Sequence, residues 1–202
     1  MADFKKMIPF IFHFAAGVWG KDGADLRLPL EQQFEIARKK GWSDDPDDPG
    51  GKTMIDVTFD AYKTYCRQKG YPVPTATRLR NIPFSQWQEI LKTMYWDKMQ
   101  ADKIISQGIA NICVDWLWAS GVSRIKNIQK ILGVTQDGIV GPKTLAAING
   151  ANPTTLFAKL YTAREKYYRG CSGWKKYGNG WMRRLDAING DGSFTIYEKT
   201  FK

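Results

Sequence analysis

A run of aspartate, proline and glycine over residues 43–51 constrains the fold of this chain more than any other feature. Pro46 and Pro49 remove backbone donors, and Gly50 and Gly51 permit positive φ, so the run cannot form a helix or a central strand. Aspartate side chains favour turns because their oxygens accept hydrogen bonds from nearby backbone N–H groups. We therefore expect a loop of fixed shape over this run.

Apolar residues at helical spacing predict most of the other elements. We expect a first helix within Ile8–Trp19, then helices over 30–40, from Thr58 to Lys69, after a cap at Ser85, over 108–118, after Gly141–Pro142, and over 154–168. Asn152 can cap the last helix, and Pro153 suits its first position because the missing N–H costs nothing there. Strand signals are confined to Thr53–Thr58 and Phe194–Tyr197. The chain is therefore predicted to be mainly α with a minor β element.

The formal charge of +10 favours an anionic partner, such as nucleic acid, a membrane surface or an acidic cell wall. Nucleic acid is not expected, because the basic residues are scattered and no helix-turn-helix, RNA-binding or zinc-finger pattern is present. No apolar run approaches the roughly 20 residues that cross a bilayer. Pro9 and His13 interrupt the apolar segment Ile8–Trp19, which favours a buried first helix over a signal peptide.

The composition offers little for metal or cofactor chemistry, and we expect neither a metal nor a cofactor. A single histidine and three widely spaced cysteines nearly exclude a zinc site. The cysteines are interpreted as reduced thiols, as in a cytoplasmic protein. The aspartate loop lacks EF-hand spacing, since Pro46 and Pro49 stand where that calcium loop does not accept them. His13 lies in an apolar segment and is interpreted as a core residue.

Two features leave a carbohydrate site open. The aspartates of residues 44–48 could provide a base or a stabilising carboxylate beside a sugar, or they could serve only as turn formers. Tyr95 and Trp118 lie on expected helices, where aromatic residues usually belong to the core, although exposed rings also stack on sugars. Stacking combined with positive charge would suit single-stranded nucleic acid as well.

The segment Asp45–Thr53, D-P-D-D-P-G-G-K-T, resembles the segment N-D-P-x-D-x-G-G-x-T of glycoside hydrolase family 108. Tyr95–Asp97, and Val114–Trp116 with Ala119–Gly121, resemble the mid-chain helices of that family. Leu132–Leu145 is similar to its C-terminal peptidoglycan-binding part. The resemblance implies a lysozyme-like helical fold and an endolysin-type N-acetylmuramidase that cleaves the β-1,4 bond after N-acetylmuramic acid. Members occur in phages and prophages, and some are secretion-associated.

The resemblance also implies a domain organisation and partners. We expect a muramidase core over residues 1–132, with an insert at about 18–41, and a smaller C-terminal peptidoglycan-binding part over 133–202 packed on the core. The boundary lies in a turn-rich connection near Gly133. The implied partners are peptidoglycan glycan strands and a holin for release. We expect a monomer without stable membrane insertion, located in the cytoplasm until its release to the cell wall or periplasm.

The catalytic acid of the family is a glutamate in a Glu-Gly-Gly-Tyr motif that ends the first helix. Aligning Ile8–Ile11 with that helix places Ala15 at the glutamate position. If the short spacing to the aspartate loop is kept instead, Lys39 stands there. Neither residue is an acid. The family also has glycine where this chain has Asp56, and we expect Asp56 to alter or crowd that position.

Three explanations for the missing acid stay open. The glutamate at position 15 was changed to alanine by engineering, the chain is a natural inactive relative that binds glycan, or another acid serves an active enzyme. Candidates for another acid are Glu35, Asp45, Asp48 and Asp56.

The resemblance assigns roles to particular positions. A glutamate at position 15, in an apolar wall of Phe12, Phe14 and Trp19, would have a raised pKa and could donate a proton to the leaving oxygen. Asp45 or Asp48 would remain ionised and stabilise the oxocarbenium-like state. The candidates for substrate binding are Trp19, Trp42, Thr53, Asp56, Tyr95 and Trp118.

Overall fold

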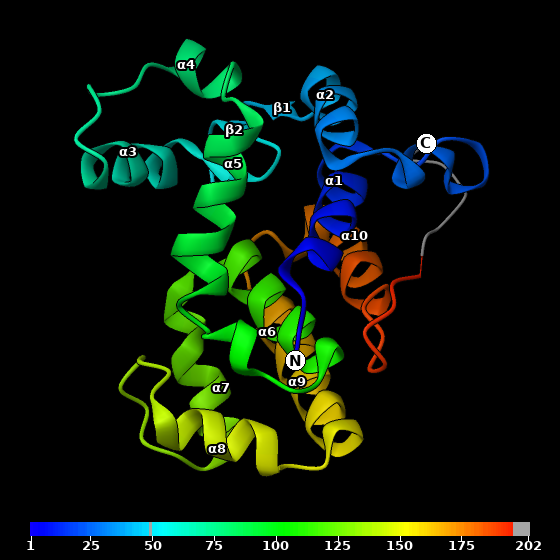
Figure 1. The fold of residues 1–202 in the computed structure, drawn as a ribbon, viewed down its shortest axis with the longest axis vertical. Coiled ribbons are helices and arrows are strands. Elements are labelled where there is room, and N and C mark those ends of the chain that lie inside the picture. Colours follow the sequence, from blue (N-terminus) through cyan, green and yellow to red (C-terminus); the bar gives the residue numbers. More distant parts are fainter. Residues whose placement is uncertain (49, 196–202) are drawn as a thin grey trace. The chain divides into compact units, whose positions relative to one another are not determined.

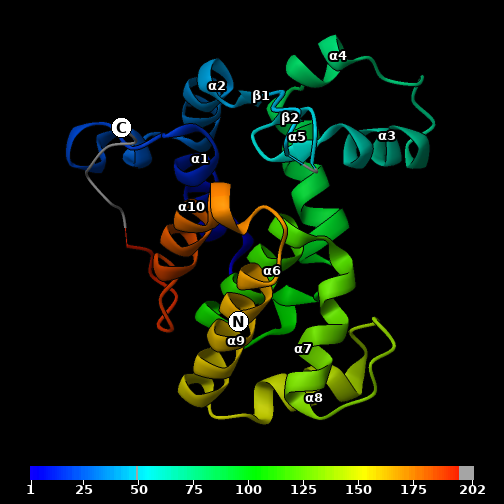
Figure 2. The same cartoon turned by 180° about the vertical axis from the view of Figure 1, so that it is seen from behind.

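The computed structural model describes residues 1–48 and 50–195. The described chain forms two compact units (Figures 1 and 2). The N-terminal unit covers residues 5–91, and the C-terminal unit covers residues 92–195 together with residues 1–4. The boundary expected near Gly133 falls inside the second unit. The mainly α architecture with a minor β element is confirmed.

Five α-helices and a small sheet build the N-terminal unit. Its elements are α1 (Ile8–Ala16), the 3-10 segment Lys21–Arg27, α2 (Leu30–Lys40), β1 (Trp42–Ser43), β2 (Thr53–Met54), β3 (Val57–Thr58), α3 (Phe59–Gln68), α4 (Ala76–Arg80) and α5 (Phe84–Leu91). Helices α1 and α2 pack side by side (Figure 1). The strands are antiparallel in the order β1-β2-β3, with Thr53 opposite both Ser43 and Thr58. The aspartate loop is therefore the connection between β1 and β2.

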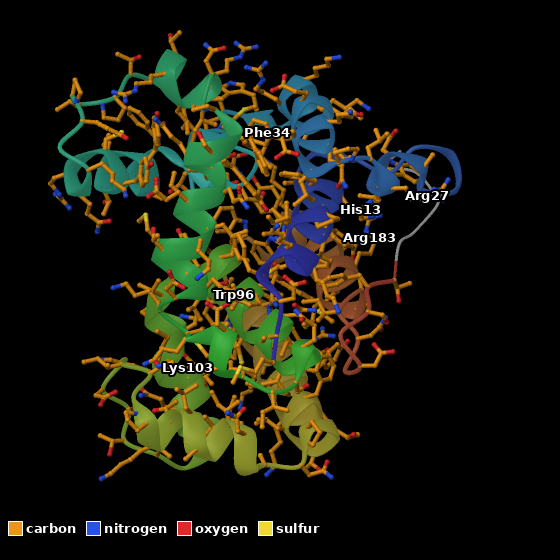
Figure 3. All side chains as sticks on the ribbon, viewed as in Figure 1. His13, Arg27, Phe34, Trp96, Lys103 and Arg183 are labelled. Carbon is orange, nitrogen blue, oxygen red and sulfur yellow. The ribbon has the colours of Figure 1, made fainter. Side chains whose placement is uncertain are left out.

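Aromatic side chains fill the interior of the N-terminal unit. Phe34 of α2 is fully buried, with its ring centroid 5.9 Å from that of Phe12 on α1 and 5.2 Å from that of Phe84 on α5 (Figure 3). The ring of Trp87 lies 4.8 Å from that of Phe12. The rings are tilted against one another, and aromatic pairs of this kind stabilise a core beyond the area they bury. This cluster fixes α1, α2 and α5 against one another.

The structure corrects two sequence expectations in this unit. Helix α5 begins at Phe84, so Ser85 lies within the helix and does not cap it. The carbonyl of Pro83 accepts the N–H groups of Gln86 and Trp87 at 3.1 Å, which starts the helix one residue earlier. Thr53–Thr58 is not one strand, because residues 55 and 56 form a turn between β2 and β3.

Helices make up most of the regular structure of the C-terminal unit. Its elements are a π-helical segment (Lys92–Trp96), 3-10 segments at Ala101–Lys103 and Val122–Arg124, α6 (Gln107–Ser120), α7 (Ile125–Leu132), α8 (Pro142–Gly150), α9 (Pro153–Arg169) and α10 (Trp174–Asp186). A further 3-10 segment, Phe4–Met7, begins at Phe4, which belongs to this unit, and continues into residues of the N-terminal unit. The predicted cap of α9 is confirmed, since Asn152 Oδ1 accepts the N–H of Thr155 at 3.0 Å. Of the expected strand Phe194–Tyr197, Phe194 forms an isolated bridge with Ile188, and residues 196 and 197 lie outside the described residues.

A buried ionic cluster joins three helices of the C-terminal unit. Asp115 of α6 is fully buried, and its carboxylate contacts Arg164 Nη2 of α9 at 2.5 Å and Arg184 Nη2 of α10 at 2.8 Å. Tyr168 adds a hydroxyl that accepts from Arg164 Nε at 2.9 Å. Helices α6, α9 and α10 run together in this unit (Figure 2). Because a buried charge without partners is very costly, this cluster specifies how the three helices pack.

Two further expectations concern the whole chain. Cys66, Cys113 and Cys171 are free in the structure, and their interpretation as reduced thiols stays a prediction. Among the residues that the structure describes, none of the helices combines the length and hydropathy that a bilayer-spanning segment needs.

Candidate functional site

The aspartates of the β1–β2 loop hold the shape of that loop. Asp45 Oδ1 accepts the N–H of Asp47 at 3.0 Å, and Asp48 Oδ1 accepts the N–H of Gly50 at 2.8 Å. Both interactions join a carboxylate to the backbone two residues on, which is the geometry of an Asx-turn. Asp44 pairs with Lys52 Nζ across the loop at 3.0 Å. The described residues of the run form a loop with the expected Asx-turns, and a catalytic role for Asp45 or Asp48 stays a prediction.

The sheet presents Trp42 and Thr53 beside this loop. Both residues are half-buried, and Trp42 lies opposite Met54 in the β1–β2 pair. The guanidinium of Arg80 lies 5.6 Å from the ring centroid of Trp42. A cation over one ring face reduces the surface that a sugar could stack on. Trp42 and Thr53 are thus brought close to the aspartates, whereas Asp56 lies at the other end of the β2–β3 hairpin.

The β2–β3 turn explains why glycine is favoured at position 56. Ile55 has φ 47° and Asp56 has φ 61°, so both central residues occupy the left-handed region of a two-residue hairpin turn. Aspartate tolerates this region better than most residues, whereas a β-branched residue rarely enters it. The requirement at Asp56 is therefore a backbone conformation that glycine adopts freely. Asp56 is half-buried at this turn.

Ala15 occupies the last turn of α1, where the chain leaves the helix through Gly17 at φ 62°. His13 and Trp19 flank this helix end, with ring centroids 6.1 Å apart, and the His13 side chain is buried (Figure 3). Burial lowers the pKa of His13, and a hydrogen bond to the Val18 backbone opposes that shift only in part. Nδ1 of His13 is buried without a hydrogen-bond partner. His13 is a core residue, as expected, and the end of α1 is largely apolar.

Lys39 occupies the last turn of α2 and is exposed. The helix ends at Gly41, whose N–H donates to the carbonyl of Ala37 at 2.8 Å. The chain then enters β1 and the aspartate loop directly. Lys39 therefore lies near the end of α2, the helix that precedes β1 and the aspartate loop, whereas Ala15 lies near the end of α1.

Tyr95 and Trp118 belong to the C-terminal unit and contact each other. Their rings meet edge to face with centroids 4.9 Å apart. Trp118 is only 7% exposed, so most of its side chain belongs to the core. This is the role that aromatic residues on helices usually have. Burial raises the pKa of the Tyr95 hydroxyl. The structure places this pair together, and substrate binding by either ring stays a prediction.

Sequence reasoning missed the residue that organises the connection between α7 and α8. The side chain of Gln129 is completely buried on α7 and contacts three residues of the following turn, as described below. The signal in the sequence was weak, namely one glutamine next to Ile128 on an otherwise apolar helix face. For metals, no cluster of three or more histidine, cysteine, aspartate or glutamate side chains forms within residues 1–48 and 50–195.

Comparison with known proteins identifies the class to which this fold and loop belong. Residues 34–121 match the family described as Glycosyl hydrolase 108, and residues 123–186 match the family described as Predicted Peptidoglycan domain. These two matches support glycosyl hydrolase family 108 with a C-terminal peptidoglycan-binding part. Its partner class is peptidoglycan. The expected family is confirmed.

A solved structure is similar over nearly the whole chain. The structure titled "Structure of Brucella abortus SagA" has a TM-score of 0.71 and 25% sequence identity, and the alignment covers 92% of this chain and 90% of that chain. The comparison with curated proteins gives no match. The lysozyme-like helical fold expected from the sequence is thereby confirmed.

The bounds of the family match bear on the two candidate positions for the missing acid. The match begins at Phe34, within α2. Lys39 and the aspartate loop lie inside the matched residues, and Ala15 lies outside them.

Proposed function

We propose that this protein binds the glycan strands of peptidoglycan as an endolysin-type muramidase that lacks the catalytic acid. The reaction of the parent enzyme would be hydrolysis of the β-1,4 bond after N-acetylmuramic acid. One observation carries the proposal: both helix ends that could present the glutamate carry another residue, Ala15 on α1 and Lys39 on α2. Alanine has no proton to donate to the leaving oxygen. A lysine cation would oppose the positive charge that develops on the sugar ring.

Different observations support the two positions. Position 15 is half-buried on a largely apolar helix end, and partial burial would raise the pKa of a glutamate there, because burial disfavours the charged form of a carboxyl group. The end of α2 lies next to the aspartate loop in sequence and within the family match. Each position is therefore tested separately by restoring a glutamate.

Binding would survive the loss of the acid because the rest of the framework is intact. The aspartate loop retains its Asx-turns, and the sheet retains Trp42 and Thr53 beside it. In residues 92–195, lysine and arginine outnumber aspartate and glutamate by 15 to 7, compared with 13 to 11 in residues 5–91. The C-terminal unit would thus add attraction to an anionic wall that weakens with salt. This charge also favours the second candidate function, a non-catalytic cell-wall-binding or secretion-associated module.

Co-sedimentation with purified sacculi and release of reducing sugar ends together test the proposal. We expect the protein to sediment with sacculi and to release sugar ends at least about 100-fold more slowly than an active muramidase, since a general acid contributes about 10²–10⁴-fold. Release at the rate of an active enzyme would show that another acid, such as Glu35 or Asp56, serves catalysis. Failure to sediment with sacculi at low salt would overturn the binding function.

A further inference from the structure

The turn between α7 and α8 is held by one buried side chain. Gln129 Nε2 donates to Asp137 Oδ1 at 2.7 Å and to the carbonyl of Ile139 at 3.0 Å, while its Oε1 accepts the N–H of Gly138 at 2.8 Å. Asp137 Oδ1 also accepts the N–H of Ile139 at 2.8 Å. The backbone of the turn is therefore held at consecutive residues, so the turn has little conformational freedom left to lose on binding a partner.

This fixed turn presents an aliphatic side chain to water. Ile139 is 69% exposed, although its neighbour Val140 is buried. Contact with a partner would bury part of the Ile139 surface, and the turn would lose little further freedom in making that contact.

Two lysines and one aspartate place their charges around the turn. The hydrogen bond from the Ile139 backbone, followed by that from Gln129, lowers the pKa of Asp137, whose exposed carboxylate is therefore ionised, with Oδ1 bonded within the turn. Lys126 runs along the turn, with its Cε 3.3 Å from the position that a Cβ on Gly138 would occupy. Lys143 is exposed in the first turn of α8. A partner at this turn would thus meet two lysines and one carboxylate.

We propose that the turn Asp137–Pro142 docks on the peptide stems of peptidoglycan. Ile139 would contact the methyl groups of stem alanines, and Lys126 and Lys143 would attract the stem carboxylates. The sugar strand is a poorer occupant, because residues 133–144 contain no aromatic ring on which a sugar could stack. This inference rests on the proposed peptidoglycan-binding function and identifies a stem-binding surface in the C-terminal unit.

The chain offers a matched control for the test. Ile105 lies in the same unit and is 66% exposed, close to the 69% of Ile139, but it is not part of this turn. Ile139→Ser and Ile105→Ser are compared for co-sedimentation with intact sacculi and with glycan strands whose stems have been removed by an amidase. Because both side chains are exposed, both variants are expected to melt at the wild-type temperature.

We expect Ile139→Ser to weaken binding to intact sacculi about tenfold, as for partial burial of one aliphatic side chain, and Ile105→Ser to change it less than twofold. The difference is expected to disappear on stem-free strands. Wild-type binding to sacculi with no effect of Ile139→Ser, or an equal effect on stem-free strands, would overturn this inference while leaving the proposed function standing. Absence of wild-type binding to sacculi would overturn both.

Discussion

The indole Nε1 of Trp87 on α5 donates a hydrogen bond of 3.0 Å to the carbonyl oxygen of Ile55, inside the turn that joins β2 and β3. The N–H of Ile55 donates to the carbonyl of Gly41 at 2.8 Å. The N–H and the carbonyl of Ile55, a β-branched residue at positive φ, are thus both hydrogen-bonded although Ile55 is buried. Since such a conformation persists only when its surroundings determine it, Trp87 and Gly41 keep the turn that carries Asp56 in place.

Replacing the indole donor tests this relationship. We expect Trp87→Phe to lower the free energy of unfolding by about 1–3 kcal/mol through the unsatisfied carbonyl alone, in addition to the lost volume. Trp116 provides the control, because it is equally buried but its Nε1 has no hydrogen-bond partner. Trp116→Phe should therefore cost less in urea unfolding. A cost for Trp116→Phe equal to or above that of Trp87→Phe would contradict the role of the hydrogen bond.

A second prediction concerns the close approach at Gly41. A Cβ there would lie 2.6 Å from Cγ1 of Ile55 and 2.9 Å from the carbonyl oxygen of Ala37. We expect Gly41→Ala to destabilise the protein by about 1–3 kcal/mol, as overpacking does. Gly180 in α10 has open space around its Cβ position, so Gly180→Ala should stabilise by about 0.5–1 kcal/mol. Thermal unfolding that shifts both variants in the same direction would refute this assignment.

The ionic cluster in the C-terminal unit gives the largest expected effect. Asp115→Asn leaves Arg164 and Arg184 without their carboxylate, and breaking a buried ion pair costs about 3–5 kcal/mol. The exposed pair of Asp60 with Lys63 is a suitable reference, since Asp60→Asn should change stability by less than about 1 kcal/mol. Denaturant unfolding measures both variants. Equal effects would show that the buried cluster contributes no more than a surface pair.

The same aspartate predicts how stability depends on pH. Burial alone would raise the pKa of Asp115, but the guanidinium groups of Arg184 and Arg164 lower it overall. The folded state then favours the charged carboxylate, so its contribution is complete above the unfolded pKa of about 3.9 and is lost as the pH falls through the lower folded value. We expect the melting temperature of wild type to fall more steeply below about pH 4 than that of Asp115→Asn. Parallel curves over this range would contradict the assignment.

Local signals in the sequence predicted several elements at their observed bounds. Helix α2 runs from Leu30 to Lys40 as expected, and Asn152 caps α9 because capping depends only on residues near in sequence. The Thr53–Thr58 segment was predicted wrongly as one strand. Its turn is formed by Ile-Asp, which lacks the Asn-Gly signal, and it is held by the distant Trp87.

Side-chain arrangements could be predicted only where they depend on residues near in sequence. The turns made by Asp45 and Asp48 follow from their own sequence and were expected. The cluster around Asp115 joins residues of three helices, and no local pattern pairs them. Gln129 is likewise recognisable only once α7 and the following turn are placed together.

Restoring the acid tests the central claim most directly. Release of reducing sugar ends from sacculi is measured for wild type, Lys39→Glu and Ala15→Glu at equal amounts of bound protein. We predict that wild type stays at background and that the rate of sugar-end release rises about 10²–10⁴-fold in one variant. Activity in Lys39→Glu would place the missing acid at the end of α2, and activity in Ala15→Glu would place it at the end of α1. Cleavage by wild type at the rate of the variants, or no gain in either variant, would contradict the claim that a missing glutamate disables this chain.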